Sequence, residues 1–205
     1  MIDEGYTRFA VRWSDRRPVE HAEVALLERW RRPLFEAGLV GHYEDAGIGY
    51  GNLSLRIGSG REFLVSGTQT GHLAHTDREH YALVTDYDID GNTVHCRGAV
   101  QASSETLTHA AIYALDAAFG AVVHVHDEPL WRRLRGFAPT TREDVAYGTP
   151  EMARELARLY RETDFPAARL AVMAGHEAGI ITAGRSLAEA AQRVLALHFS
   201  KEDSR

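Results

Sequence analysis

Apolar residues recur along the chain with two spacings, which separate predicted helices from predicted strands. Where they return every three or four residues we expect amphipathic helices, and where they alternate with polar residues we expect strands. Helices are predicted at residues 19–38, 103–119, 150–160 and 187–198. Strands are predicted at residues 51–57, 61–66, 82–89, 93–97, 121–126, 170–174 and 179–182.

Local signals mark where several of these elements end. Gly38 is expected to stop the first helix, and Ser186 to cap the last one. Asp90-Gly91-Asn92 predicts a hairpin turn between two strands. Because the early strands form hairpins and helices occur throughout, we expect an α/β fold, with helices on both faces of a sheet rich in antiparallel pairs. The length of 205 residues fits a single domain over residues 1–205.

Composition and charge exclude several classes of protein. The chain has 23 basic and 29 acidic residues, a net charge of −6, which argues against a nucleic-acid partner. No apolar run approaches the ~20 residues that a membrane span requires, and the acidic amino terminus lacks the apolar stretch of a signal peptide. Cys96 is the only cysteine, so an intrachain disulfide is impossible. These features predict a cytoplasmic protein without a membrane partner.

The basic residues are arginines with one exception, Lys201, close to the carboxyl end. Enzymes that form a Schiff base need a lysine held in a desolvated pocket, and a chain terminus is a poor place for one. A phosphate loop of the Walker type also needs a Gly-Lys pair, which this sequence lacks. With 11 histidines in the chain, we expect its chemistry to depend on imidazole, carboxylate or a metal.

His124-Val125-His126 is the most informative short motif. Residues i and i+2 of a strand point to the same face, so both imidazoles could bind one metal ion. His176, between two glycine-containing segments, is a candidate third ligand, and three histidines with an open position are typical of catalytic zinc. Taken separately, these residues are equally compatible with packed core histidines or with a histidine in a solvent-exposed turn.

Ser103-Ser104-Glu105 lies where the second predicted helix begins. One interpretation is simple capping of the helix by hydroxyls and an acid. The alternative is an anion site suited to phosphate, with the carboxylate of Glu105 acting as a base beside a metal. Residues 49–54 and 65–68 also have the composition of anion-binding backbone.

Taken together and in order, these segments resemble the class II aldolase/adducin family, and in particular its fuculose-phosphate-type metal-dependent aldolases. The matching segments are Gly51-Asn52-Leu53-Ser54, Ser66-Gly67-Thr68, Ser103-Ser104-Glu105, His109-Ala110-Ala111-Ile112-Tyr113, Ala121 to His126, Gly175-His176, and Gly184 to Ala190. They span residues ~50–190, nearly the whole chain, and their shared order makes the resemblance specific.

The resemblance implies a three-layer α/β/α sandwich with a largely antiparallel central sheet. It implies a divalent metal, zinc or another, held by His124, His126 and His176, with Glu105 sharing the metal and acting as acid/base. It assigns the substrate phosphate to five residues, namely Asn52, Ser66, Gly67, Ser103 and Ser104. It also implies a homotetramer with sites at subunit interfaces.

The implied activity is that of a lyase in carbohydrate metabolism. It would cleave a small phosphorylated sugar or related hydroxy-ketone, of the ketose 1-phosphate type, through a metal-stabilised enediolate. This chemistry needs no lysine, because the metal replaces the iminium as electron sink. The alternatives are a ketose-phosphate dehydratase or epimerase on the same site, and a non-catalytic adducin-like interaction module. The family's epimerases tend to place Asp where this chain has Glu105.

Two local departures from the family pattern affect the site. The family places glycine directly after its third histidine, whereas here Glu177 and Ala178 separate His176 from Gly179. The family's aldolases also take a tyrosine from a neighbouring subunit as proton donor. Tyr147 lies near the matching segment without aligning to it, so the proton donor is left unassigned.

Overall fold

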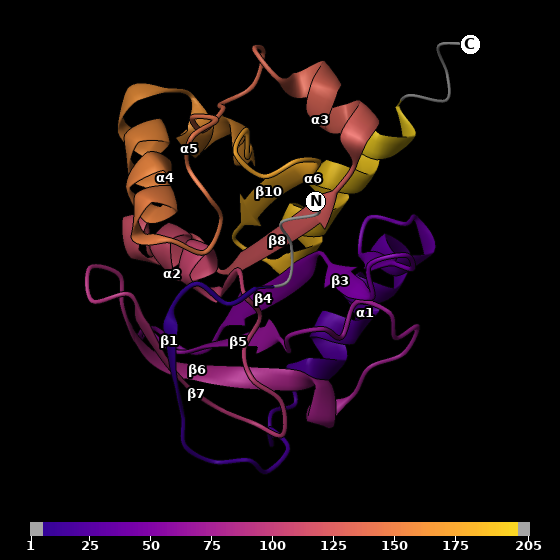
Figure 1. Cartoon of the computed structure of the whole chain (residues 1–205), viewed down its shortest axis with the longest axis vertical. Coiled ribbons are helices and arrows are strands. Elements are labelled where there is room, and N and C mark those ends of the chain that lie inside the picture. Colours follow the sequence, from indigo (N-terminus) through magenta and orange to yellow (C-terminus); the bar gives the residue numbers. More distant parts are fainter. Residues whose placement is uncertain (1–5, 201–205) are drawn as a thin grey trace.

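An eight-stranded sheet lies at the centre of the computed structural model, which describes residues 6–200 (Figure 1). The strand order is β1-β7-β6-β5-β4-β8-β10-β9. Every neighbouring pair is antiparallel except β1 and β7, which are parallel. The expected α/β fold with a largely antiparallel sheet is therefore confirmed.

The bounds of the elements follow the predicted pattern closely in the middle of the chain. The sheet contains β1 (Ala10–Trp13), β4 (Asn52–Arg56), β5 (Phe63–Ser66), β6 (Tyr81–Asp88), β7 (Thr93–Arg97), β8 (Ala121–His126), β9 (Leu170–Val172) and β10 (Gly179–Gly184). A separate ribbon pairs β2 (Gly41–Tyr43) with β3 (Ile48–Tyr50). The α-helices are α1 (Val24–Glu36), α2 (Thr106–Leu115), α3 (Glu128–Leu134), α4 (Pro150–Glu162), α5 (Phe165–Ala168) and α6 (Leu187–Phe199), and a 3₁₀ turn covers Arg78–His80.

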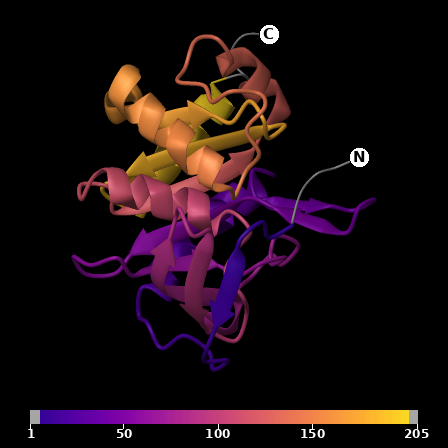
Figure 2. The same cartoon turned by 60° about the vertical axis from the view of Figure 1, so that its left-hand side comes forward.

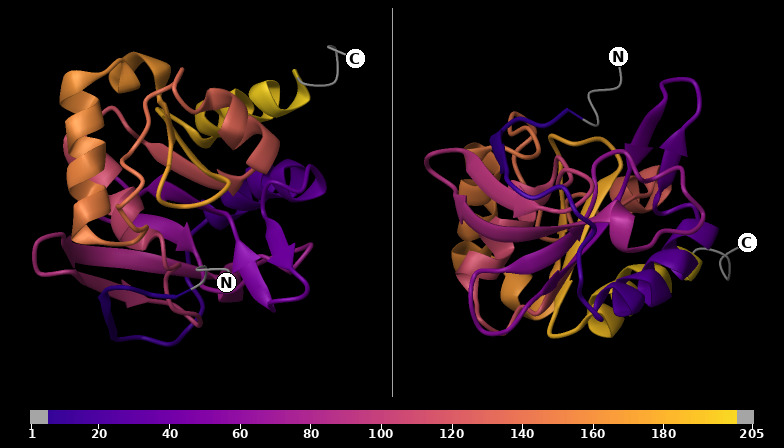
Figure 3. Two further views of the ribbon diagram at one scale, coloured as in Figure 1. Left: turned by 45° about the horizontal axis from the view of Figure 1, so that its top comes forward. Right: turned by 90° about the horizontal axis from the view of Figure 1, so that it is seen from below.

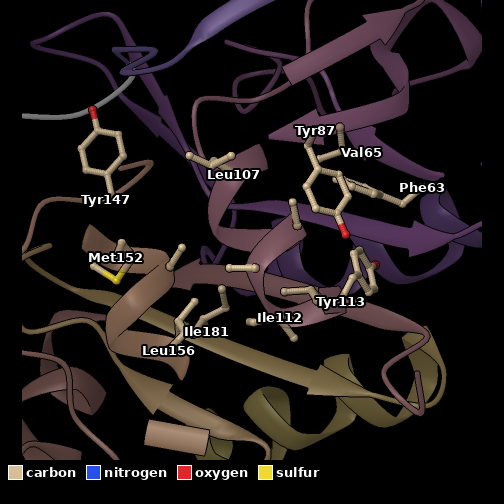
Figure 4. Packing of buried hydrophobic residues seen from close by; sticks show 14 of the residues in the cluster. Phe63, Val65, Tyr87, Leu107, Ile112, Tyr113, Tyr147, Met152, Leu156 and Ile181 are labelled. Atoms are coloured by element: carbon tan, nitrogen blue, oxygen red, sulfur yellow. The ribbon is translucent and has the colours of Figure 1, made fainter. Parts of the chain in front are cut away.

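Successive side chains of a strand point to opposite faces of the sheet, so the buried side chains form two cores, one on each face. In β8, Val122 joins the core under α2 and α4, whereas Val123 and Val125 join the core under α1 and α6. The right-hand view of Figure 3 shows these two pairs of helices on opposite sides of the sheet, and Figure 2 shows α2 and α4 side by side. Figure 4 shows the first core, in which Ile112 and Ile181 pack between helix and sheet. The three-layer arrangement is thus confirmed.

Several predicted boundaries need correction. The first helix begins at Val24 rather than residue 19, and the second is shorter at both ends. The predicted end signals are confirmed: Gly38 has φ +70°, and the Ser186 hydroxyl accepts a hydrogen bond from the Glu189 amide. The pattern missed β1, the β2–β3 ribbon and the short helices α3 and α5. Among residues 6–200, no helix is long and apolar enough to cross a membrane. Lys201 lies outside the described residues.

Candidate metal centre and anion cavity

Strand β8 carries the centre of the site. It lies between β4 and β10, where His124 faces Asn52 on one side and Ile181 on the other. Because the strand alternates, His124 and His126 share the face of Val122, under α2. His176 lies in the turn between β9 and β10 and reaches the pair because β10 begins directly opposite His126. The structure thus brings all three predicted histidines together.

The three histidines present their Nε2 atoms to one point. The Nε2–Nε2 distances are 3.2 Å between His126 and His124, 3.1 Å between His126 and His176, and 3.3 Å between His176 and His124. A tetrahedral zinc ion with Zn–N bonds of ~2.0–2.1 Å separates its ligand nitrogens by ~3.3–3.4 Å. The triangle therefore has the size of one face of a tetrahedral zinc site, and these three residues fit a divalent metal.

The protonation state of these three histidines, called the triad below, also suits metal binding. Burial lowers the pKa of His124 to about 4 and holds the pKa values of His126 and His176 well below their usual range, so all three rings are neutral at neutral pH. The Nδ1 atom of His124 lies 3.2 Å from the Ile180 carbonyl, which only accepts hydrogen bonds. Nδ1 therefore carries the proton, and Nε2 presents a bare lone pair to the centre, as a metal ligand must.

Glu105 borders the triad without joining it. Its Oε1 atom lies 3.4 Å from Nε2 of His176 and 4.0 Å from Nε2 of His124, and its side chain is buried. It occupies the N-cap position of α2 but makes no side-chain capping hydrogen bond, so capping does not explain it. The cluster of mutually close ligand atoms contains only the three histidines among the described residues, and a shared bond from Glu105 to the metal stays a prediction.

The carboxyl group of Glu105 is buried beside the imidazoles of His176 and His124. Neither carboxylate oxygen has a well-aligned hydrogen-bond donor among residues 6–200. Burial raises the pKa of Glu105 to about 8, against the opposing effects of the Thr108 hydroxyl and the Arg8 guanidinium. In the metal-free protein this side chain is a neutral acid at neutral pH, and an adjacent cation favours its ionised form.

A small cavity opens beside the start of α2. Four of the five residues predicted to hold a phosphate line it, namely Asn52, Gly67, Ser103 and Ser104, together with Gly49, Gly51, Thr68, Gln69, Thr70 and Gly71. The hydroxyl of Ser66 has a different use: it accepts a hydrogen bond from the Leu53 amide at 3.1 Å and joins β5 to β4. The Oδ1 atom of Asn52 is buried without a hydrogen-bond partner in the described chain, so it can accept from a donor group of a ligand, whereas a phosphate would need the amide Nδ2 of the same side chain.

Arg31, which the sequence pattern did not identify, holds the loop that lines this cavity. Arg31 in α1 is almost fully buried and donates from Nη2 to the carbonyls of Thr70, at 3.0 Å, and Leu73, at 2.6 Å. It thereby ties the cavity-lining loop to the helix layer. In a single sequence Arg31 is one more charged residue in an amphipathic helix, so no signal could have identified it.

Three tyrosines border the triad, of which Tyr43 and Tyr50 were not predicted as site residues. Oη of Tyr43 lies 2.8 Å from Nδ1 of His126, and the ring of Tyr50 stacks on the same imidazole with centroids 5.3 Å apart. The ring of Tyr147 lies 4.5 Å from that of His176, and its hydroxyl accepts a hydrogen bond from the Tyr6 amide at 3.1 Å. Tyr147 thus borders the site of its own chain. In Figure 4 its hydroxyl points away from the rest of the core.

Two further histidines have identified partners near the triad. Nδ1 of His109, one turn after Glu105, lies 2.7 Å from the Ser54 hydroxyl, and the His109 ring is fully buried. His198 in α6 pairs with Asp127 at 2.8 Å, and Asp127 directly follows His126 in the chain. Neither histidine belongs to the group of ligand atoms that lie close together, which contains His124, His126 and His176.

The altered spacing after His176 does not displace the ring. Ala178 adopts a φ of +64°, the left-handed conformation that usually favours glycine, and the chain then enters β10 at Gly179. A Cβ atom on Gly179 would lie 2.6 Å from Cδ2 of His176, so the missing side chain makes room for the imidazole. The turn therefore places His176 where a third metal ligand would lie, although its sequence departs from the family pattern.

Comparison with known proteins finds a sequence family that part of this chain resembles. Residues 36–130 match the sequence profile of the Class II Aldolase and Adducin N-terminal domain, a segment that includes Asn52, Glu105, His124 and His126. The resemblance to the class II aldolase/adducin family is confirmed. His176 lies beyond the matched segment, so its place in the triad rests on the structure. No curated protein matches the chain by sequence.

Several solved structures share the fold of this chain. L-fuculose-1-phosphate aldolase from Thermus thermophilus is 21% identical, with a TM-score of 0.61 over 87% of this chain and 90% of the other. The sugar-phosphate aldolase from Thermotoga maritima is 16% identical, with a TM-score of 0.65 over 87% and 91%. YgbL from Klebsiella pneumoniae, described as an aldolase, epimerase or decarboxylase, is 21% identical, with a TM-score of 0.65 over 88% and 86%. At these identities the similarity establishes the fold.

Proposed function

We propose that this protein is a class II, divalent-metal-dependent aldolase that cleaves a small phosphorylated sugar of the ketose 1-phosphate type. The observation that carries the proposal is the triangle of three buried Nε2 atoms beside the buried carboxyl group of Glu105. The same helix start that positions Glu105 also lines the anion cavity, which places an acid/base and an anion site next to one another. A non-catalytic interaction module would have no use for this combination.

His124, His126 and His176 would hold the metal, with zinc as the preferred ion because three imidazoles and an open position are typical of catalytic zinc. When bound, the metal supplies Lewis-acid stabilisation for the negative charge that develops on the oxygens of a hydroxy-ketone. The protein's own contribution is to keep the three rings neutral and aligned by burial and by the Ile180 carbonyl.

Glu105 would hold and move the proton. With a cation nearby its carboxylate is ionised and accepts a proton at Oε1, the oxygen that faces the triad. Neither carboxylate oxygen has a well-aligned hydrogen bond within residues 6–200, which would leave the carboxylate available to the substrate. The proposal includes the homotetramer of the family's aldolases, which sedimentation of the purified protein tests.

The anion cavity would bind the substrate phosphate through Asn52, Gly67, Ser103 and Ser104. The Ser103 hydroxyl already accepts from the Glu105 amide, at 3.3 Å, and can still donate its own proton to a phosphate. Ser66, whose hydroxyl accepts a hydrogen bond from the Leu53 amide, would hold together the two strands next to the cavity.

Replacing Ser104 by alanine, alone or together with Ser103, should raise KM for a phosphorylated substrate at least tenfold and change kcat less. A hydrogen bond to a charged group contributes ~1.5–3 kcal/mol, and ~1.4 kcal/mol is a factor of ten in affinity. Steady-state kinetics measure this, with the exposed Ser59→Ala as the control. Equal activity of the wild type on unphosphorylated sugars would show that the substrate class is wrong.

Replacing Gly179 by alanine should weaken metal binding about tenfold, the lower end of what loss of a ligand's supporting contact costs. The new Cβ would meet the His176 ring at 2.6 Å and turn it away from the other two Nε2 atoms. Competition with a chromogenic chelator measures the affinity. Gly60→Ala, which meets nothing within 4 Å, is the matched control, and equal affinities in the two variants would contradict the prediction.

A panel of ketose 1-phosphates, followed by NMR detection of the products, tests the reaction itself. Two smaller carbonyl compounds mean aldol cleavage, a deoxy product means dehydration, and an inverted stereocentre means epimerisation. Glu105, where the family's epimerases tend to have Asp, favours cleavage. Metal analysis of the purified protein separates all three from the adducin-like module, which is expected to contain no metal.

A further inference from the structure

We propose that Tyr43 is a positioning residue for the metal centre: its phenol oxygen accepts the Nδ1–H of His126 and so turns the Nε2 lone pair of that ring toward the triad. The inference rests on the metal-binding part of the proposed function and not on the aldol reaction. Oη of Tyr43 and Nδ1 of His126 are 2.8 Å apart, a good hydrogen-bond distance.

The direction of this hydrogen bond follows from the geometry on the other side of the ring. Nε2 of His126 faces two further Nε2 atoms at 3.1 and 3.2 Å, so a metal there requires Nε2 to be unprotonated. The single proton of the neutral imidazole is then on Nδ1, and Tyr43 accepts it. His124 obtains the same tautomer from the Ile180 carbonyl, which gives two of the three rings a backing acceptor.

The β2–β3 ribbon holds Tyr43 in place from two directions. Tyr50 on the opposite strand packs against Tyr43, with ring centroids 4.5 Å apart, and its own ring stacks on His126. The base of the ribbon is pressed against the cavity-lining loop, because a Cβ on Gly71 would lie only 2.1 Å from the Gly41 carbonyl oxygen. The ribbon projects from the edge of the molecule in the right-hand view of Figure 3, and Tyr43 and Tyr50 connect it to His126.

The loop at the base of the ribbon is itself fixed by Arg31, through the carbonyls of Thr70 and Leu73. One continuous set of contacts therefore runs from α1 through the anion cavity and the ribbon to His126. A phenol is neutral, so Tyr43 orients the ring without adding a negative charge behind it, unlike the carboxylate that often occupies this position. This leaves the positive charge of a bound cation to act on the substrate.

Tyr43→Phe removes only the phenol oxygen and tests the proposal. We expect the affinity for Co²⁺ and Zn²⁺, measured by chelator competition on the full-length protein, to fall 10- to 100-fold, the usual effect of losing a ligand's backing partner. In ¹⁵N-edited spectra of the Zn²⁺-loaded protein, the Nδ1–H signal of His126 should exchange with water faster. The His124 signal, held by Ile180, should not change and serves as the internal reference.

Tyr160→Phe is the matched control, since it also loses one tyrosine hydroxyl hydrogen bond, to Asp116 at 3.0 Å, far from the triad. Thermal unfolding of the metal-free variants separates metal binding from folding. Unchanged affinity and unchanged exchange in Tyr43→Phe would overturn the inference while leaving the proposed function intact. Failure of the wild type to bind either metal would overturn both. If Tyr43→Phe lowers affinity only in step with a loss of apo stability, Tyr43 is structural and the inference is wrong.

Discussion

Replacing His124 or His126 by alanine is expected to abolish metal binding and activity together. Each imidazole supplies one of three bonds, and backing partners alone account for a 10- to 100-fold change in affinity, so loss of a ligand should cost more than ~100-fold. The Nε2 atoms form a closed triangle with edges of 3.1 to 3.3 Å, which leaves no other described nitrogen to replace a missing one. Elemental analysis and turnover assays on the same preparations measure both effects.

His95→Ala provides the control, because His95 lies on a strand of the same sheet but its side chain is exposed. That variant should keep its full metal content and activity. Circular dichroism of each variant shows whether the sheet is intact, since β8 lies in its middle and a misfolded protein would also lack metal. Normal metal stoichiometry in folded His124→Ala and His126→Ala would disprove the assignment of the pair.

The sequence pattern predicted the central strands because they are short apolar runs buried on both faces of the sheet, and the main helices because their apolar residues recur every three or four positions. Residues 121–126 were predicted as a strand and form β8 without any change of bounds. The sequence pattern did not predict β1, because its four residues lie at the sheet edge and pair in parallel with β7, more than 80 positions later. The β2–β3 ribbon was not predicted either, because its strands are only three residues long and neither has a continuous apolar face.

The sequence predicted the candidate metal ligands of the site, but not the residues that contact and orient them. The His-x-His pair shares a face because of strand geometry alone, and its position on a strand was predictable from Ala121, Val122 and Val123. His176 needed the fold, since only the β8–β10 pairing brings position 176 to position 126. Arg31 and Tyr43 act through contacts 39 and 83 positions away in the chain, which no local spacing encodes. A turn signal at Asp45-Ala46-Gly47 between tyrosines could have suggested the ribbon.

Replacing Glu105 by glutamine is expected to lower turnover by ~10²–10⁴, the usual contribution of a positioned acid/base, while the metal stays bound. Glutamine matches the shape of the neutral acid, and burial raises the pKa of Glu105 to about 8, so the metal-free protein already contains an uncharged side chain here at neutral pH. The substitution should therefore leave the apo melting temperature nearly unchanged. It removes a carboxylate that faces the triad and can accept a proton once a cation is present.

Exchange of the substrate's enolisable proton with solvent deuterium isolates the step in which Glu105 acts, and it should fall in parallel with turnover. Glu177→Gln is the matched control: it neutralises an exposed carboxylate next to His176 in the chain and should change neither rate. Near-normal exchange in Glu105→Gln would assign the proton to another group, and Tyr147, packed on His176, is then the first to examine. Loss of metal from a folded Glu105→Gln protein would instead make the carboxylate chiefly a ligand. In that case the three imidazoles would be too weak to hold the ion alone, and Oε1 would be a further ligand, since its 3.4 Å from Nε2 of His176 already matches the spacing of two ligand atoms on one tetrahedral ion.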